Sequence, residues 1–171
     1  MEQRWGEPRA GRVCAPGALA EALARARAAG ARVVLTNGCF DLLHVGHLRY
    51  LEEAKRLGDV LVVGVNDDAA VCALKGAGRP LVPAAERAEL VAALRPVDLV
   101  VIFEERTADA LLRRVRPDVY VKGGDYRAET LPEAETAVEV GALVRLVALQ
   151  PGWSSSDLVA RIVQRLGSDA R

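Results

Sequence analysis

Short apolar runs rich in valine and leucine alternate along this chain with stretches in which apolar residues recur every three or four positions. The runs are typical of buried strands, and the periodic stretches are typical of amphipathic helices. The pattern predicts strands over residues 32–36, 59–66, 97–103, 118–122 and 143–149. It predicts helices over residues 16–29, 45–57, 68–74, 84–94, 107–116, 132–140 and 154–166. Asp67 or Asp68, Thr107 and Ser154 are of the residue types that cap helix N-termini.

Strands that alternate with helices indicate an α/β fold with a single, doubly wound parallel sheet of about five strands and helices on both faces. Residues 1–30 are interpreted as an N-terminal extension and helix, and residues 31–166 as the domain that carries the sheet. Ligands of such sheets bind beyond the carboxyl ends of the strands, where the strand order reverses. This rule selects three loops, at residues 37–47, 122–126 and 151–156.

Composition narrows the class of protein. The chain has 171 residues, which suits one domain, and 51% of them are hydrophobic. Lys plus Arg number 23 and Asp plus Glu number 23, and no segment concentrates basic residues enough to predict nucleic-acid binding. The cysteines, Cys14, Cys39 and Cys72, form no C-x-x-C pair, which argues against a disulfide scaffold and favours a cytoplasmic location. No apolar run reaches the roughly 18 residues that a membrane span needs.

The two histidines of the chain both fall in the first selected loop, as His44-Val45-Gly46-His47. A helix N-terminus attracts phosphate through its free N–H groups and its dipole, and Gly46 lets a phosphate approach the backbone closely. Both imidazoles can donate hydrogen bonds to phosphate oxygens, and these bonds strengthen as negative charge builds on an attacked α-phosphate. The pair therefore predicts a site that stabilises transfer at a phosphate.

Two other interpretations of the pair are open. Histidines on a helix can simply be core or surface residues. Alternatively, Cys39, Asp41, His44 and His47 could surround a metal ion, because zinc favours these ligand types. No distant ligand is evident in the sequence, so no metal site is predicted.

Residues 36–51, TNGCFDLLHVGHLRYL, contain an HxGH element and resemble the nucleotidyltransferase superfamily that includes the cytidylyltransferases. Five further segments extend the resemblance over about residues 31–166 to the adenylyltransferase domain of the ADP-heptose synthase family: GDVLVVGVNDD, LKGAGRPLVPAAER, VDLVVIFEE, RPDVYVKGGDY and GWSSSDLV. The resemblance implies a Rossmann-like nucleotidyltransferase domain over residues 31–166. It is expected to be free-standing, without the sugar kinase to which such a domain is often fused.

The resemblance also implies roles for particular residues. His44, His47 and Arg87 are the expected catalytic residues, and Asp41, Asp68, Lys75 and Arg79 are expected to bind the second substrate. The expected nucleotide-binding residues come from all three loops: Thr36, Asn37, Gly38, Cys39, Phe40, His44, Gly46, His47, Lys122, Gly123, Gly124, Asp125, Ser154, Ser155 and Ser156.

Each segment also has a plainer interpretation, and the sequence departs from the family at two positions. The serines can simply cap a helix, the Gly-Gly-Asp segment can be an ordinary turn, and the cations can be solvated. Trp153 stands where the family has a small residue, which changes the shape of the pocket. Ala85 stands where the family often has Glu, so Arg87 loses an orienting contact or obtains it from Glu86.

The resemblance implies transfer of AMP from ATP to a sugar 1-phosphate, D-glycero-D-manno-heptose 1-phosphate, with release of pyrophosphate. Mg²⁺ is expected to accompany ATP. A homodimer is expected, with no nucleic-acid or membrane partner. Two alternatives stay open: cytidylyl or guanylyl transfer to another phosphorylated sugar or polyol, and a nucleotide-binding module without catalysis.

Overall fold

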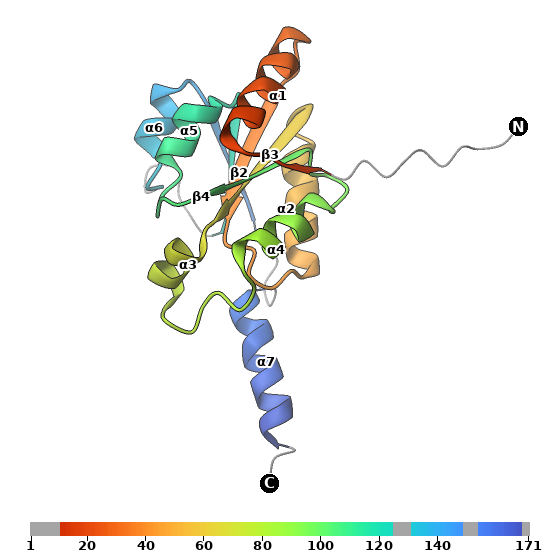
Figure 1. Ribbon diagram of the computed structural model, residues 1–171, viewed down its shortest axis with the longest axis vertical. Coiled ribbons are helices and arrows are strands. Elements are labelled where there is room, and N and C mark those ends of the chain that lie inside the picture. The colour runs from red at the N-terminus through yellow and green to blue at the C-terminus, as the bar shows by residue number, and fades with distance from the viewer. Residues whose placement is uncertain (1–10, 125–130, 149–153, 169–171) are drawn as a thin grey trace, which may run out of the picture.

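The computed structural model describes residues 11–124, 131–148 and 154–168. The sheet has the strands β1 (Arg12–Val13), β2 (Val33–Gly38), β3 (Val60–Asn66), β4 (Leu99–Phe103), β5 (Val119–Gly123) and β6 (Leu143–Val147). The helices are α1 (Pro16–Ala28), α2 (Val45–Lys55), α3 (Asp68–Lys75), α4 (Ala84–Ala92), α5 (Asp109–Val115), α6 (Ala134–Glu139) and α7 (Ser155–Ser168) (Figure 1). All paired strands are parallel, in the order β1-β4-β3-β2-β5-β6. The predicted α/β fold is confirmed.

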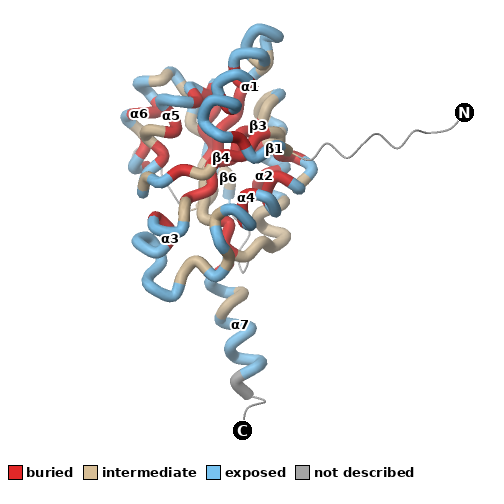
Figure 2. Tube along the Cα trace, viewed as in Figure 1, coloured by how far each residue is buried: buried red, intermediate tan, exposed pale blue. Residues whose placement is uncertain are grey.

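Two apolar clusters cover the two faces of the sheet, because successive side chains of a strand point to opposite sides. Val33 and Leu35 of β2 belong to a cluster with α1, α5 and α6, whereas Val34 belongs to a cluster with α2 and α4. The central strands β2 to β5 are therefore largely buried on both sides, and Figure 2 shows buried backbone along the centre of the molecule, whereas the edge strands β1 and β6 are mostly exposed. This double coverage explains why the strands read as nearly continuous apolar runs.

The strand count differs from the prediction, because a sixth strand lies near the N-terminus. Strand β1 has only two residues, both exposed, and it pairs with Leu99 and Val100 at the edge of the sheet. It pairs with β4 although the two strands are far apart in the sequence, and no apolar run in this segment predicts a strand. The segment assigned to an N-terminal extension therefore contributes a strand to the sheet.

The helix caps match the prediction in part. Asp67 caps α3 by accepting a hydrogen bond from the Ala70 N–H at 2.7 Å. The prediction for Thr107 was wrong, because α5 begins after Ala108 without a side-chain cap. The Thr107 hydroxyl instead donates to the Asp109 carboxylate at 2.6 Å.

The strand order reverses at β2, which has β3 on one side and β5 on the other. Helix α2 leads from β2 to β3 on one face of the sheet, while α5 leads from β4 to β5 on the opposite face. The carboxyl ends of β2 and β5 thus flank the crevice where open α/β sheets bind ligands. Asn37 and Lys122 stand at these two ends.

Helix α7 extends away from the body of the molecule (Figure 1). Most of its described positions are exposed, and the apolar side chains of Ile162, Val163 and Leu166 are among them. None of the helices formed by the described residues is both long enough and apolar enough to cross a membrane.

Candidate functional site

A cavity of about 430 Å³ opens at the carboxyl ends of β2, β3 and β5. Its lining comes from the ends of these strands, from the loop after β2, and from α2, α3 and the segments before α5 and α6; the lining residues include Asn37, Gly38, Cys39, Phe40, His47, Tyr50, Asn66, Lys75, Arg106, Thr107, Lys122, Gly123 and Glu133. A neighbouring cavity shares Lys75 and is lined also by Arg79 and by Ser156 of α7. Lys75 therefore borders both spaces.

The two histidines meet at the N-terminus of α2. His44 is the N-cap residue, in an extended conformation and without a side-chain cap, and His47 lies in the first turn. Their rings are stacked with centroids 3.9 Å apart, and Phe40 packs 5.2 Å from the His47 ring. This geometry places both imidazoles beside the positive end of the helix dipole.

Burial and neighbouring positive charge keep both imidazoles neutral. Burial lowers the pKa of His47 to about 4, and repulsion from His44 in its protonated form and from Lys75 contributes in that order. Burial, followed by the charges of Arg161 and Lys75, lowers the pKa of His44. A polyanion placed here would meet cations and one N–H donor on each ring.

The backbone of the first loop is shaped around Phe40, which adopts a left-handed conformation with φ of 49°. A Cβ atom added at Gly38 would stand 3.1 Å from the Phe40 ring, which is closer than normal packing allows. Glycine at this position thus lets the Phe40 ring fold back over the strand end. The ring in turn packs against His47.

Tyr50 connects α2 to the sheet beneath the histidines. Its hydroxyl lies 2.5 Å from the Thr36 hydroxyl and donates to the Val121 carbonyl at 3.1 Å. Burial raises the pKa of Tyr50, so this hydroxyl keeps its proton. Thr36 itself is fully buried, so its side chain faces Tyr50 rather than the cavity.

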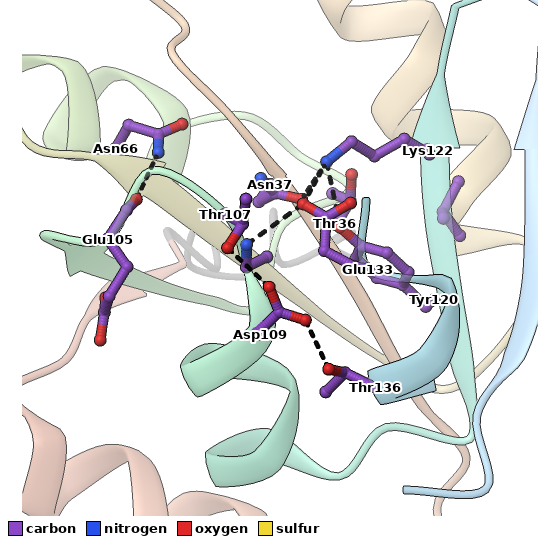
Figure 3. Close-up of polar contacts among 12 residues, drawn as sticks. Thr36, Asn37, Asn66, Glu105, Thr107, Asp109, Tyr120, Lys122, Glu133 and Thr136 are labelled. Carbon is purple, nitrogen blue, oxygen red and sulfur yellow. Dashed lines mark hydrogen bonds and ion pairs between the residues drawn. The ribbon is translucent and has the colours of Figure 1, made fainter. Parts of the chain in front are cut away.

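A second polar group joins β2 to β5 (Figure 3). Tyr120 donates to the Asn37 side-chain oxygen at 2.8 Å, and Lys122 Nζ lies 3.2 Å from the same oxygen. Lys122 also pairs with the buried carboxylate of Glu133 at 3.0 Å. Asn37, Lys122 and Glu133 all border the cavity.

The comparisons with known proteins agree with this geometry. A model of the family described as cytidylyltransferase-like matches residues 35–161. The chain belongs to the cytidylyltransferase-like family. It is a nucleotidyltransferase, and the resemblance indicated by the sequence motifs is confirmed.

Curated relatives of this cytidylyltransferase-like chain carry the name bifunctional protein HldE. The protein from Halorhodospira halophila is 53% identical over 88% of this chain and 31% of its own length. The protein from Syntrophotalea carbinolica is 49% identical over 81% of this chain and 28% of its own length. The chain thus spans only about a third of these relatives. A crystal structure of a lipopolysaccharide core biosynthesis protein from Thermoplasma volcanium is similar with a TM-score of 0.58 and 32% identity, covering 71% of this chain and 98% of its own.

The structure gives Arg87 a different position from the one expected of a catalytic phosphate contact. Its guanidinium is fully buried and donates to the carbonyl oxygens of Val82, Cys39 and Asn66 and to the Asp68 carboxylate. All of these partners belong to the protein, so the side chain joins three loops rather than facing the cavity. Asp68 supplies the orienting carboxylate that Ala85 does not.

Asp41 has the same joining function. One of its carboxylate oxygens accepts hydrogen bonds from the backbone N–H groups of Leu81 and Val82, at 2.7 and 3.0 Å. The other oxygen pairs with Arg79 at 2.5 Å, and the Asp41 side chain is fully buried. Asp41 thus fastens the loop between α3 and α4 to the histidine loop. A substrate-binding residue was expected to face the cavity, whereas the Asp41 carboxylate faces these protein groups.

The serine run divides into three different environments. Ser154 caps α7 by accepting from the Asp157 N–H at 3.0 Å, and Ser155 donates to the Leu42 carbonyl at 3.3 Å. Ser156 borders the cavity that it shares with Lys75 and Arg79. The predictions for Asp125 and Trp153 lie outside the described residues, and Gly124 is a turn residue with φ of 126° directly after β5.

The alternative of a metal site receives no support from this arrangement. Asp41 faces Arg79 and two backbone N–H groups instead of the histidines. Within the part of the chain that the structure describes, no three His, Cys, Asp or Glu side chains gather closely enough to hold a metal ion. Cys39 borders the cavity, and burial raises the pKa of its thiol, so it is a poor nucleophile.

Sequence reasoning missed several residues of this cytidylyltransferase-like site. Tyr50, Tyr120 and Glu133 hold the strand ends together through their side chains. Arg161 of α7 contributes, after burial, to the lowered pKa of His44 through its positive charge. Its position on α7, after a capped helix start, is the one local signal that could have pointed to it.

Proposed function

We propose that this chain transfers AMP from ATP to a sugar 1-phosphate, D-glycero-D-manno-heptose 1-phosphate, and releases pyrophosphate. The observation that carries the proposal is the stacked pair His44 and His47 at the N-terminus of α2, beside the crevice where the strand order reverses. The choice of ATP and heptose rests on the resemblance of the motifs to the adenylyltransferase domain of ADP-heptose synthases.

The chemistry needs no general base. A sugar phosphate already presents an anionic oxygen, which attacks the α-phosphorus in line while pyrophosphate leaves. Because both histidines are neutral, they act as hydrogen-bond donors whose bonds tighten as charge builds at the α-phosphate. Catalysis then consists of positioning and of charge stabilisation.

A second cavity has the positive charge that would bind the leaving pyrophosphate. Lys75, Arg79 and Ser156 line the second cavity, which shares Lys75 with the main cavity and offers two cations and a hydroxyl. Arg79 is held there by Asp41, which itself is anchored to backbone N–H groups. We infer that the triphosphate runs from the main cavity past Lys75 toward this second cavity.

Mg²⁺ fits this site as a companion of ATP rather than as a resident of the protein. The carboxylates of Asp41, Asp68 and Glu133 are already paired with Arg79, Arg87 and Lys122. The ion would therefore be bound mainly by phosphate oxygens, as is usual for Mg²⁺. It would supply charge neutralisation to the triphosphate.

One experiment separates the candidate functions. The protein is incubated with Mg²⁺, heptose 1-phosphate and each nucleoside triphosphate in turn, and pyrophosphate release is measured. We expect release with ATP and a loss of about 100-fold or more in kcat for His47→Asn. Turnover with CTP instead would support cytidylyl transfer, which the family name favours. Nucleotide binding without pyrophosphate release from any pair would overturn the proposal.

The same proposal covers the oligomeric state and the cellular location of the chain. We propose a homodimer that works in the cytoplasm. Sedimentation of the purified chain gives the oligomeric state directly.

A further inference from the structure

Asn37 stands at the end of β2, where the strand order reverses, and its side-chain oxygen faces two donors. The Tyr120 hydroxyl lies 2.8 Å from this oxygen and Lys122 Nζ lies 3.2 Å from it. In Figure 3 the oxygen points toward Lys122, and the nitrogen of the same amide lies on the opposite side. Among the residues that the structure describes, no acceptor is found for this NH₂ group.

The chemistry of the two neighbours allows only one orientation of the amide. An ammonium group can donate hydrogen bonds but cannot accept them. Burial and the negative charge of Glu133 raise the pKa of Tyr120, so its hydroxyl keeps a proton to donate. A flipped amide would turn its NH₂ group toward both donors and lose two hydrogen bonds.

Lys122 is itself held in place. Among the described residues its ammonium group donates to three oxygens: those of Asn37 and Tyr120, and the Glu133 carboxylate at 3.0 Å. The side chains of Lys122 and Glu133 are only 13% and 3% exposed, so this pair is shielded from water. Glu133 also accepts the backbone N–H of Ala108 at 3.1 Å, which ties the group to the start of α5.

This arrangement changes the expected role of Lys122. A lysine that contacts a phosphate directly should present its ammonium to the cavity, whereas here the ammonium faces oxygens of the protein. The group that the network leaves for a ligand is the NH₂ of Asn37, on a residue that borders the cavity together with His47.

We propose that Tyr120, Lys122 and Glu133 are positioning residues, which hold the Asn37 amide so that its NH₂ group donates a hydrogen bond to an oxygen of the bound nucleotide. The inference rests on the proposed function only for the identity of that ligand. Lys122 then acts on the nucleotide through Asn37 and not by direct contact.

A double-mutant cycle tests this relation. The variants are Asn37→Ala, Tyr120→Phe, the pair Lys122→Met with Glu133→Gln, and each change combined with Asn37→Ala. The paired substitution is used because Lys122→Met alone would leave a buried carboxylate without its partner. The affinity for ATP is measured by titration calorimetry, and KM for each substrate and kcat are measured by pyrophosphate release.

We expect Asn37→Ala to weaken ATP binding about 10-fold, and Tyr120→Phe and the paired variant to weaken it about 3- to 10-fold. In the Asn37→Ala background the same changes should weaken ATP binding by no more than a further factor of about 2, because the amide that they position is absent. KM for the sugar phosphate should stay within about 2-fold in every variant.

Additive losses would overturn the inference, since they would mean that Lys122 or Tyr120 touches the nucleotide directly. An effect confined to the sugar phosphate would overturn the assignment of the ligand. Tyr50→Phe is the matched control: this buried hydroxyl contacts Thr36 and Val121 but not Asn37, so its effect should add to that of Asn37→Ala. Because ATP binding is measured without turnover, the cycle can fail or succeed independently of the proposed reaction.

Discussion

Substitution of Arg87 distinguishes a catalytic arginine from a structural one. The fully buried guanidinium donates to three backbone carbonyl oxygens and to one carboxylate. Arg87→Met keeps most of the volume of the side chain and removes all of these donors. If the side chain acts as the structure shows, the variant should lose stability first and activity only as a consequence.

The magnitude follows from the partners that are left behind. A buried acceptor without a donor costs about 1–3 kcal/mol, and three carbonyl oxygens lose one donor each. Asp68 is half exposed, so water can replace its contact at little cost. Since each carbonyl can recover part of its loss by relaxation, we expect the free energy of unfolding to fall by about 4 kcal/mol in total.

The assay is urea and thermal unfolding of the wild type and the variant, together with kcat well below the melting temperature. A loss of about 4 kcal/mol lowers Tm by roughly 8–16 °C for a chain of this size and the urea midpoint by about 2 M. Arg87→Lys should lose about half as much, because an ammonium can still reach one or two of the carbonyl oxygens. The folded Arg87→Met variant should keep kcat within about tenfold of the wild type.

The control is Arg95→Met, an exposed arginine, which should change the free energy of unfolding by less than about 0.5 kcal/mol. The reasoning is refuted if Arg87→Met melts within about 2 °C of the wild type while kcat falls 100-fold or more. That result would mean that the guanidinium leaves its carbonyl partners and contacts the substrate.

Three further outcomes are expected from the site. His44→Asn should lower kcat by about 100- to 1000-fold with little change in Tm, and a kcat within about 2-fold of the wild type in the pyrophosphate assay would contradict the role of the pair. The pKa of His47 is about 4 in the folded protein against 6.5 as its ordinary value, so the unfolded chain binds more protons between these values. The stability that neutral His47 contributes should therefore be complete above pH 6.5 and disappear as the pH falls toward 4, and urea unfolding across this range should show a smaller pH dependence for His47→Asn. Tyr50→Phe removes the hydroxyl contacts to Thr36 and Val121 and should cost about 1–3 kcal/mol in urea unfolding, while an unchanged urea midpoint would show that these contacts are replaced by others.

Local pattern was enough to predict the main elements and two of the loops that border the main cavity. The strands β2 to β5 were predicted because residues covered on both faces must be apolar, which leaves a run of consecutive apolar positions in the sequence. The HxGH element was informative because a helix start and its neighbouring side chains are close in sequence. The structure accordingly stacks His44 on His47 and places His47 at the edge of a cavity.

The partners of the charged residues could not be predicted in the same way. Arg87 resembled a phosphate contact, yet its acceptors lie as far as 48 residues away in the chain. Lys122 meets Asn37 across 85 residues, and Asp41 meets the backbone of Leu81 across 40. A charged side chain in a loop has the same sequence signature whether it faces a substrate or a carbonyl oxygen.

The sequence by itself thus determined the parallel sheet, its apolar faces and the histidine pair at the start of α2, because periodicity and helix capping act between near neighbours. Only the tertiary structure decided that Arg87 and Asp41 fasten loops and that Thr36 faces Tyr50. The physical reason is that a buried polar group must find its partner wherever the chain brings an acceptor within about 3 Å, and the fold alone sets which distant residues come that close.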